Sequence, residues 1–516
     1  MATTSGPTDS SARWVLIATI LGSSMVFIDG SVVNVALPTI QRELSADAAS
    51  TQWFVESYAL LLAALLLVGG ALGDKFGRRR LFIVGTALFA ITSIWCGLAT
   101  NSGMLIAARA AQGIAGAILT PASLAIITAT YDKGPERGRA IGSWSGFTAI
   151  TAAFGPVLGG WLVEQASWRW IFFINVPLAA IVLFLSLTRM PESRDPDAQR
   201  IDWIGATLTT LGLGALVFGL IEAPARGWSD TLVLVSLITG VTALIAFVIV
   251  EARIDAPMMP LGLFRSRTFS GANLLTLLLY AALGGALYYV PFVLIEVQGY
   301  SSTAAGAALL PMVLLLFALS RWSGGLIGTF GAKAPLVLGP IVAAGGFALF
   351  ALPDGGGSYW TTWFPATVVL GLGLAITVAP LTTAVMSAVD EQRSGIASGI
   401  NNAVSRTASL LAIAFFGIVV SSVFDRDLTN RLDSLDLEPD VRTAVEVQTS
   451  DLAAAEPPSG IDEPTQLEIQ NAIDTSFLSG FRTVMLIAAA MAVASSLAAF
   501  LLIEGKVVTR QDEPTR

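Results

Sequence analysis

The stretch Gly70-Ala-Leu-Gly-Asp-Lys-Phe-Gly-Arg-Arg-Arg-Leu-Phe-Ile-Val-Gly85 ends one long apolar block of the chain and begins the next. It aligns without gaps, at an offset of 254 residues, to Gly324-Gly-Leu-Ile-Gly-Thr-Phe-Gly-Ala-Lys-Ala-Pro-Leu-Val-Leu-Gly339. The same shift carries the first apolar block onto the ninth. A repeat of this length indicates two parallel six-helix halves, with two extra helices between them.

The apolar blocks have the length of membrane-spanning helices. Hydrophobic residues make up 54% of the chain and charged residues 13%. A helix needs about 20 apolar residues to cross the hydrocarbon core. The sequence therefore predicts an all-α membrane protein with 14 transmembrane helices, two six-helix bundles plus two extra central helices. The predicted spans are 14–37, 53–72, 81–99, 104–128, 139–163, 169–188, 203–221, 231–250, 269–295, 304–327, 334–352, 360–385, 395–424 and 478–503.

The repeat and the spans together predict the organisation of the chain. The predicted parts are a cytoplasmic tail 1–13, an N-terminal six-helix bundle 14–190, two additional spans with flanking loops 191–262, a C-terminal six-helix bundle 263–505 and a cytoplasmic tail 506–516. The C-terminal bundle includes one long acidic loop, 425–476.

The basic residues predict the orientation. Most of the 29 Lys and Arg residues fall in the loops after even-numbered spans and in the two tails. Cytoplasmic loops carry an excess of Lys and Arg. We therefore expect a multi-pass protein of the cytoplasmic membrane with both termini in the cytoplasm.

The loop 425–476 then lies outside the cell, and it holds 13 acidic and 3 basic residues. Its simplest interpretation is a solvated spacer. The spacing of Leu428, Leu432, Leu435 and Leu437 also suggests a short amphipathic helix that covers an exit. The negative charge of the loop is a further way to gather cations.

The composition excludes several kinds of chemistry. The chain has one cysteine, Cys96, and no histidine. It can form no intramolecular disulfide, and it has no Cys or His set for a metal site or for His-based acid–base catalysis. We expect no catalytic residue, no metal and no cofactor, and we predict that the protein is not an enzyme. A group that exchanges protons inside the membrane is then an Asp or a Glu.

Three ionisable residues fall inside the spans of the first half. Asp29 lies in span 1, Glu56 in span 2 and Arg109 in span 4, all in the outer half of the membrane. A charge at the membrane centre costs at least about 2.5–3.5 kcal/mol, so such residues predict a functional site. The alternatives are an ion pair that only holds helices together and, for Glu56, a side chain that reaches water.

Two carboxylates and one arginine leave one acid without a counter-charge. We expect this acid to hold a proton until a cation arrives. Competition between a proton and a cationic ligand for one carboxylate is enough for exchange. Glu296, at the outer end of span 9, is a candidate for an outer acidic site, although solvation is the simpler interpretation.

Two glycine-containing motifs complete the candidate set. In the turn after span 2, Gly73, Asp74, Gly77 and Arg78 form a predicted conformational latch, because glycine allows close approach and positive φ. Orientation by charge alone is the alternative, and no acid stands at the position of Asp74 in the second copy of the repeat. Span 5 carries Gly155, Pro156, Gly159 and Gly160, which favour close helix packing and a kink. Ordinary packing is the alternative for this motif.

Taken together, these motifs resemble one family over nearly the whole chain. The chain is similar to fourteen-span drug:proton antiporters of the major facilitator superfamily, the multidrug exporter type. The matching stretches are Phe27-Ile-Asp-Gly-Ser-Val-Val-Asn-Val-Ala-Leu-Pro38, Gly73 to Arg80, Arg109-Ala-Ala-Gln-Gly113, Gly155 to Gly160 and Ser167-Trp-Arg-Trp-Ile-Phe-Phe-Ile-Asn-Val-Pro177.

The resemblance implies roles for individual residues. It implies that Asp29 takes part in cation binding and proton coupling, that Arg109 assists proton transfer, and that Asp74 and Arg78 stabilise one conformation. Gly155 to Gly160 correspond to the antiporter motif. An acid at the position of Glu56 is found in members that export cations, so it favours cationic substrates.

The expected function is export of lipophilic, cationic drugs or toxic compounds by alternating access, driven by the proton gradient. The expected partners are the small-molecule substrate, protons and the lipid bilayer, with no nucleic acid, and the protein is expected to be a monomer. One alternative is export of an endogenous metabolite, a lipid or a self-made antibiotic. Another is a membrane receptor or an efflux-assembly partner without transport of its own.

Overall fold

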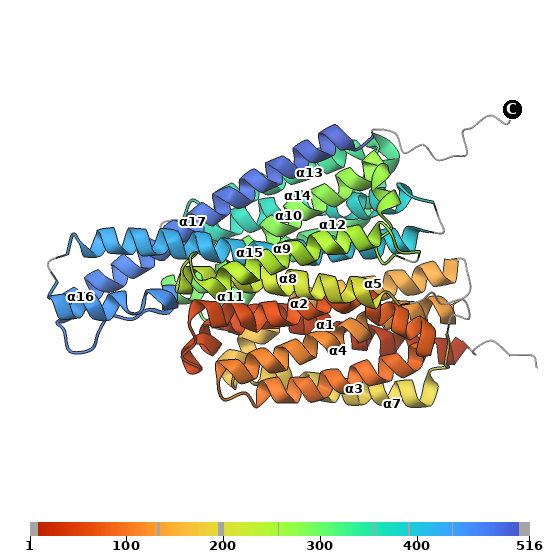
Figure 1. The fold of residues 1–516 in the computed structure, drawn as a ribbon, viewed down its shortest axis with the longest axis horizontal. Helices are drawn as coiled ribbons and strands as arrows, with labels where there is room; N and C mark the ends of the chain where they lie inside the picture. The colour runs from red at the N-terminus through yellow and green to blue at the C-terminus, as the bar shows by residue number, and fades with distance from the viewer. Residues whose placement is uncertain are drawn as a thin grey trace, which may run out of the picture. The chain divides into compact units, whose positions relative to one another are not determined.

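The structure, a computed structural model, describes residues 9–131, 135–194, 201–255, 257–353, 357–390, 393–435 and 437–504 (Figure 1). Every regular element in these ranges is a helix, and 14 helices are long and apolar enough to cross a membrane. The prediction of an all-α chain with fourteen such helices is therefore confirmed. The tail 506–516 and the first eight residues of the tail 1–13 lie outside the described residues.

The helices follow the predicted spans, and most of their ends extend beyond them. The first half contains α1 (Asp9–Glu43), α2 (Ala48–Phe76), α3 (Arg78–Gly97), α4 (Ser102–Thr130), α5 (Pro135–Gln165), α6 (Trp170–Phe173), α7 (Asn175–Arg189), α8 (Trp203–Arg226) and α9 (Thr231–Glu251). The second half contains η1 (Leu261–Arg265), α10 (Arg267–Phe292), η2 (Val293–Val297), α11 (Ser302–Ala308), α12 (Leu310–Phe330), α13 (Lys333–Phe350), α14 (Tyr359–Ser387), α15 (Ser394–Leu432), α16 (Pro439–Glu446), η4 (Thr449–Ala454) and α17 (Glu463–Leu502).

The chain divides into two compact units. The first comprises Met1–Leu216, Val235–Met258 and Tyr300–Ala307, and the second comprises Val217–Leu234, Met259–Gly299 and Ala308–Arg516. The boundary between Ala307 and Ala308 falls inside the predicted span 304–327. The helix of this span is interrupted close to that boundary, between α11 and α12. The predicted domain boundaries at 190 and 262 stay a prediction.

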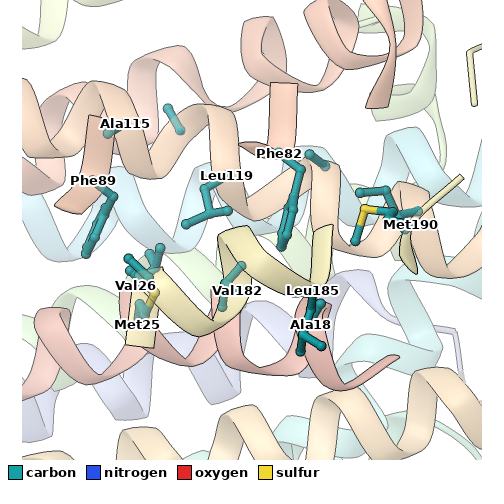
Figure 2. Packing of buried hydrophobic residues seen from close by; sticks show 14 of the residues in the cluster. Ala18, Met25, Val26, Phe82, Phe89, Ala115, Leu119, Val182, Leu185 and Met190 are labelled. Atoms are coloured by element: carbon teal, nitrogen blue, oxygen red, sulfur yellow. The ribbon is translucent and has the colours of Figure 1, made fainter. Parts of the chain in front are cut away.

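The first unit is held together by a shared apolar core and by close helix contacts. Its core joins α1, α2, α3, α4 and α7, as Figure 2 shows for Met25, Phe82, Leu119 and Val182 of four of these helices. Elsewhere the backbones of two helices meet at glycine. A methyl group at Gly69 of α2 would lie 2.0 Å from the carbonyl oxygen of Ala117 in α4. Only glycine permits this approach, and small residues at helix contacts are typical of membrane proteins.

The segment 425–476 differs from the predicted solvated spacer. α15 continues to Leu432, α17 begins at Glu463, and α16 and η4 lie between them, so most of the described segment is helical. Its apolar side chains explain the difference. Leu428, Leu432, Val445, Ile469 and Ile473 are all buried, as the apolar side of a folded helical segment requires. We call residues 425–476 the cap; it extends past the other helices of the second unit (Figure 1).

Local hydrogen bonds define where the last helix begins. The side chain of Asp462 accepts hydrogen bonds from the backbone N–H of Thr465, at 3.2 Å, and from its hydroxyl, at 2.8 Å. These bonds lower the pKa of Asp462, because they favour the charged carboxylate. The capped residue therefore stays ionised and fixes the start of α17 within the cap.

The contact between α2 and α4 predicts opposite effects of two similar substitutions. In Gly69→Ala the methyl group meets the Ala117 carbonyl, and overpacking of this kind costs about 1–3 kcal/mol. In Gly73→Ala, one turn further along α2, the methyl group meets nothing within 4 Å, so only the better helix propensity of alanine acts. We expect the first variant to unfold at a lower temperature than the native protein and the second at the same or a higher temperature. Thermal unfolding in detergent measures both, and equal midpoints would contradict the close contact.

Candidate functional site

A buried ion pair joins the first and fourth helices. Arg109 of α4 donates a hydrogen bond from Nη1 to Oδ2 of Asp29 in α1. Both side chains are fully inside the protein, with exposed fractions of 1% and 0%. Arg109 also donates from Nε to the backbone carbonyl of Phe54 in α2, at 2.9 Å. The arginine thereby connects three helices, and its charge is compensated at the centre of the first unit.

Two amide side chains complete the surroundings of Asp29. Gln112 donates from Nε2 to Asp29 Oδ1 at 2.9 Å and accepts from Arg109 Nη1 at 2.7 Å. Asn175 of α7 donates from Nδ2 to the same Asp29 oxygen at 3.3 Å. Both amides also donate to the hydroxyl of Ser93 in α3, at 2.9 and 3.2 Å. The five side chains form one polar network, which a membrane interior requires because it offers no water as a partner.

Aromatic rings enclose the arginine. The guanidinium of Arg109 lies 4.2 Å from the ring centre of Tyr58 and 5.7 Å from that of Phe172. The hydroxyl of Tyr58 donates to the carbonyl of Val26, at 3.3 Å. These rings stabilise the cation through their π faces.

Glu56 lies apart from this network, although it is equally buried. Its exposed fraction is 0%, so the alternative that it reaches water does not apply in this conformation. Neither of its carboxylate oxygens has a hydrogen-bond partner among the residues that the structure describes. Burial without a partner strongly disfavours a charged carboxylate. Of the three ionisable residues predicted together, the structure thus pairs Asp29 with Arg109 and leaves Glu56 as the acid without a counter-charge.

Glu296 belongs to the second unit. It lies in the π-helical segment η2, which continues α10 in the second unit, and it is half-buried. A π-helical turn is frequent at functional sites. Its role as an outer acidic site stays a prediction. Among the described residues, no group of three or more acidic, Cys or His side chains is placed to hold a metal.

The predicted latch residues form a defined turn. Arg78 donates to Asp74 Oδ1 from both Nε and Nη2, at 2.8 Å. Gly77 has a φ of +113°, which favours glycine at this position. Gly73 accepts the N–H of Gly77 and so ends α2. The geometry of the turn agrees with the expected pairing of Asp74 and Arg78, while its action as a latch stays a prediction.

Glu192, which the sequence analysis did not single out, closes the same turn. Its carboxylate accepts the backbone N–H groups of Arg79 and Arg80, at 3.0 and 3.2 Å, at the start of α3. In return, Arg79 donates from its side chain to the carbonyls of Ser186 and Leu187 near the end of α7. An acid at a helix N-terminus and a base at a helix C-terminus are each favourable. These hydrogen bonds link the start of α3 to the end of α7 and hold the two helices together.

The span-5 motif lies at two helix contacts. Methyl groups at Gly155 and Gly159 would overlap Ser31 and Val32 of α1. Gly160 faces the other way, and a methyl group there would lie 2.2 Å from the carbonyl of Ser302 at the start of α11. The carbonyl of Pro156 in turn lies 2.2 Å from the position of a methyl group on Gly306. The motif therefore packs α5 against both α1 and α11, where Glu164 also accepts a hydrogen bond from Thr303.

Comparison with known sequences identifies relatives over most of the chain. A family model described as Major Facilitator Superfamily matches residues 19–413. The multidrug resistance protein Stp of Mycobacterium tuberculosis (strain CDC 1551 / Oshkosh) is 34% identical, over 92% of this chain and 89% of its own. The tetracenomycin C resistance and export protein of Streptomyces glaucescens is 33% identical, over 97% of this chain and 92% of its own.

Comparison with solved structures supports the same fold. A bacterial homologue of the human lysosomal transporter Spinster, in an inward-facing and unoccupied conformation, matches with a TM-score of 0.69. The match covers 96% of this chain and 97% of the other, at 18% sequence identity. The xylose transporter XylE from E. coli matches with a TM-score of 0.58 at 14% identity, over 96% and 98% of the two chains.

The buried ion pair predicts strong coupling between two substitutions. Asp29→Asn leaves the Arg109 guanidinium without its counter-charge, and Arg109→Gln leaves the Asp29 carboxylate without its counter-charge. Loss of one partner of a buried pair costs about 3–5 kcal/mol. We expect the double variant to be more stable than the sum of the two single losses predicts. Chemical unfolding of the four proteins in detergent measures this coupling.

The matched control is the pair Glu222 and Arg226, one turn apart on α8, in which Arg226 is exposed and Glu222 is half-buried. Its amide substitutions, Glu222→Gln and Arg226→Gln, should have small and additive effects because solvent screens the charges. If the losses of stability in Asp29→Asn and Arg109→Gln also add up in the double variant, the proposed dependence of each charge on the other is wrong.

Proposed function

We propose that this chain, which belongs to the Major Facilitator Superfamily, exports lipophilic, cationic drugs or antibiotics in exchange for protons. The observation that carries the proposal is the contrast between its two buried acids. Asp29 has a full set of donors around it, whereas Glu56 is buried with no donor among the described residues. One acid is paired with an arginine, and the other is free to take up and release a positive charge.

Glu56 is the residue that exchanges a proton for the substrate. In the conformation described here its carboxyl group is neutral, because a buried charge without a partner is too costly. A lipophilic cation that enters beside it supplies the missing counter-charge and allows the proton to leave. The proton and the cation then compete for one carboxylate, so each can be moved only when the other is absent.

Asp29 and Arg109 set the conditions for this exchange. The ion pair and its amide partners connect α1, α2, α3, α4 and α7, so a change of charge on one side chain alters contacts on several helices. When Arg109 leaves Asp29, the freed carboxylate becomes a second binding site for a cation or proton. This assigns proton coupling to Asp29, Glu56 and Arg109 acting together.

The substrate class follows from the site and from the relatives. The names of the matched proteins include multidrug resistance, tetracenomycin C export and puromycin resistance. An acid that lacks a counter-charge favours a cationic substrate, and aromatic rings such as Tyr58 favour a lipophilic one. A natural-product antibiotic satisfies both conditions when it carries a basic nitrogen.

The remaining motifs serve the conformational change. Alternating access proceeds by rocking of the two bundles in the cytoplasmic membrane, with both termini in the cytoplasm. Asp74 and Arg78 act as the latch on the cytoplasmic face, and the span-5 glycines let α5 move against α1 and α11. The monomer suffices for this cycle, and the proton gradient drives it without a cofactor.

The experiment uses purified protein in liposomes with an imposed pH gradient and ethidium as the lipophilic cation. We expect ethidium to trigger proton movement in the native protein and at least tenfold less movement in Glu56→Gln, which keeps the shape of the side chain and cannot ionise. Asp29→Asn should abolish exchange, and circular dichroism should show that the sample is folded.

The control is Glu222→Gln, an acid-to-amide change at the exposed end of α8, which should exchange at the native rate. Normal exchange by Glu56→Gln would refute the role of Glu56. Transport of ethidium without proton movement would refute the coupling, and transport of neutral antibiotics alone would refute the cationic substrate class.

A further inference from the structure

The side chain of Asn175, at the start of α7, has only one end of its amide in the polar network. The side chain is fully buried, with an exposed fraction of 0%. Its Nδ2 donates to Asp29 Oδ1, at 3.3 Å, and to Ser93 Oγ, at 3.2 Å. Its Oδ1 is also buried, and it has no hydrogen-bond partner among the described residues. A buried acceptor without a donor is rare in proteins and requires an explanation, which the exchange mechanism does not give.

The position of Asn175 follows from a proline two residues later. α6 and α7 belong to one candidate membrane span, which is interrupted at Ile174. Pro177 has no N–H to donate to the carbonyl of Phe173, four residues earlier, so a regular helix cannot continue through this point. The interruption places the amide at the first residue of α7, beside α1 and α3. This part of the span was among the quoted motifs, yet the exchange mechanism assigns it no role.

The surroundings of the unpartnered oxygen are well defined. The helices packed against α7 are α1, α3 and α6, and all three lie within the described ranges. Near the network, the titratable groups besides Asp29 are Arg109, Cys96 and Tyr58. The Cys96 thiol donates to Gln112 Oε1, at 3.5 Å, and the Tyr58 hydroxyl donates to a backbone carbonyl. The helices α3, α5 and α7 carry charged residues only near their ends.

Rotation of the Asn175 amide by 180° would exchange its donor and its acceptor. Oδ1 would then take the place of Nδ2 and accept an O–H from both Asp29 and Ser93. The rotated amide keeps two hydrogen bonds with their direction reversed, and it leaves one of its ends unpartnered, as before. An ionised carboxylate can only accept, whereas a protonated one has an O–H to donate. The two orientations of the amide therefore match the two protonation states of Asp29.

Gln112, the other amide of the network, cannot make the same change. Its Oε1 accepts from Arg109 Nη1, at 2.7 Å. Its Nε2 donates to Asp29 and Ser93, both at 2.9 Å. Rotation would break all three bonds and bring two donors together. Because Gln112 and Arg109 lie three residues apart on α4, their bond also persists when Arg109 separates from Asp29 on α1. The Gln112 oxygen is thus occupied in both states, and the Asn175 oxygen is available.

We propose that Asn175 is a positioning residue that accepts the O–H of protonated Asp29 after rotation of its amide, while Ser93 turns its own O–H to the same oxygen. This role rests on the proposed function, in which the freed Asp29 carboxylate binds a proton. The membrane interior offers no water to replace a missing partner. An amide that donates to the charged acid and accepts from the neutral one supplies a partner in both states, so that Asp29 can bind and release its proton.

The test is infrared difference spectroscopy of the full-length protein in lipid, between neutral and acidic pH, with 13C-labelled asparagine. We expect acidification to produce a carboxylic-acid carbonyl band that is lost in Asp29→Asn. Together with it, one asparagine side-chain carbonyl band should shift to lower wavenumber, because its oxygen gains hydrogen bonds. This shift should be lost in Asp29→Asn and in Asn175→Leu, which has a similar shape and no polar side-chain atom. If Asn175→Leu does not fold, Asn175→Ala removes the same amide.

The matched control is Asn401→Leu in α15 of the second unit. Asn401 also donates to two side chains, Asn273 Oδ1 at 3.1 Å and Thr276 Oγ1 at 2.7 Å, but neither acceptor is an acid. Its removal should leave both the carboxylic-acid band and the asparagine shift unchanged. A purely structural role of Asn175 would produce no shift that accompanies the protonation of Asp29.

The outcomes that overturn the proposal also distinguish it from the proposed function. If the Asp29 band appears without an asparagine shift, the role of Asn175 is wrong and proton binding by Asp29 stands. A glutamine shift in its place, seen with labelled glutamine, assigns the acceptor to Gln112. A shift that persists in Asn175→Leu belongs to another asparagine and likewise refutes the role. If no Asp29 band appears at any pH at which the protein is folded, proton coupling through Asp29 is wrong, and the role of Asn175 is wrong with it.

Discussion

The interaction on which the first unit depends is the buried ion pair between Asp29 and Arg109. A charge in a membrane interior is stable only when the protein supplies its partners. Here the partners come from α1, α2, α3, α4 and α7, so the requirement to satisfy one arginine fixes five helices relative to each other. The same requirement makes the pair sensitive, because a change of charge at any member leaves another member without a partner.

The contrast between the two acids of the first unit gives the site its chemistry. Asp29 accepts three hydrogen bonds, and Glu56 accepts none from the described residues. A network in which every group was satisfied would hold the helices together and do nothing more. An acid without a partner, in the same unit as a paired one, provides a place where a positive charge can bind and leave while the Asp29–Arg109 pair stays intact.

Much of this could be predicted from the sequence, for identifiable reasons. The length of each apolar block predicts where a helix crosses the membrane. Within such a block, an ionisable residue such as Asp29 or Arg109 is easily recognised. Gln112 and Asn175 appeared in the quoted motifs, yet their contacts depend on helix rotation, which no spacing reveals. Ser93 carries no signal at all, because serine is common in membrane helices. Glu192 lies more than 100 residues from the turn it caps. For the cap, the many charges favoured a solvated spacer, whereas the spacing of Leu428 and Leu432, two residues that are buried, indicated the helix.

The helices of the cap have a mechanical consequence. α15 has 39 residues and α17 has 40, so at about 1.5 Å per residue each is roughly twice as long as the hydrocarbon core is thick. A stiff rod that continues beyond the bilayer acts as a lever, and a small tilt of its buried part becomes a larger displacement at its free end. The displacement of the tip of the cap, near α16, therefore reports how far the helices of the second unit tilt. A pair of spectroscopic labels placed there would follow that motion in real time without disturbing any residue of the buried network.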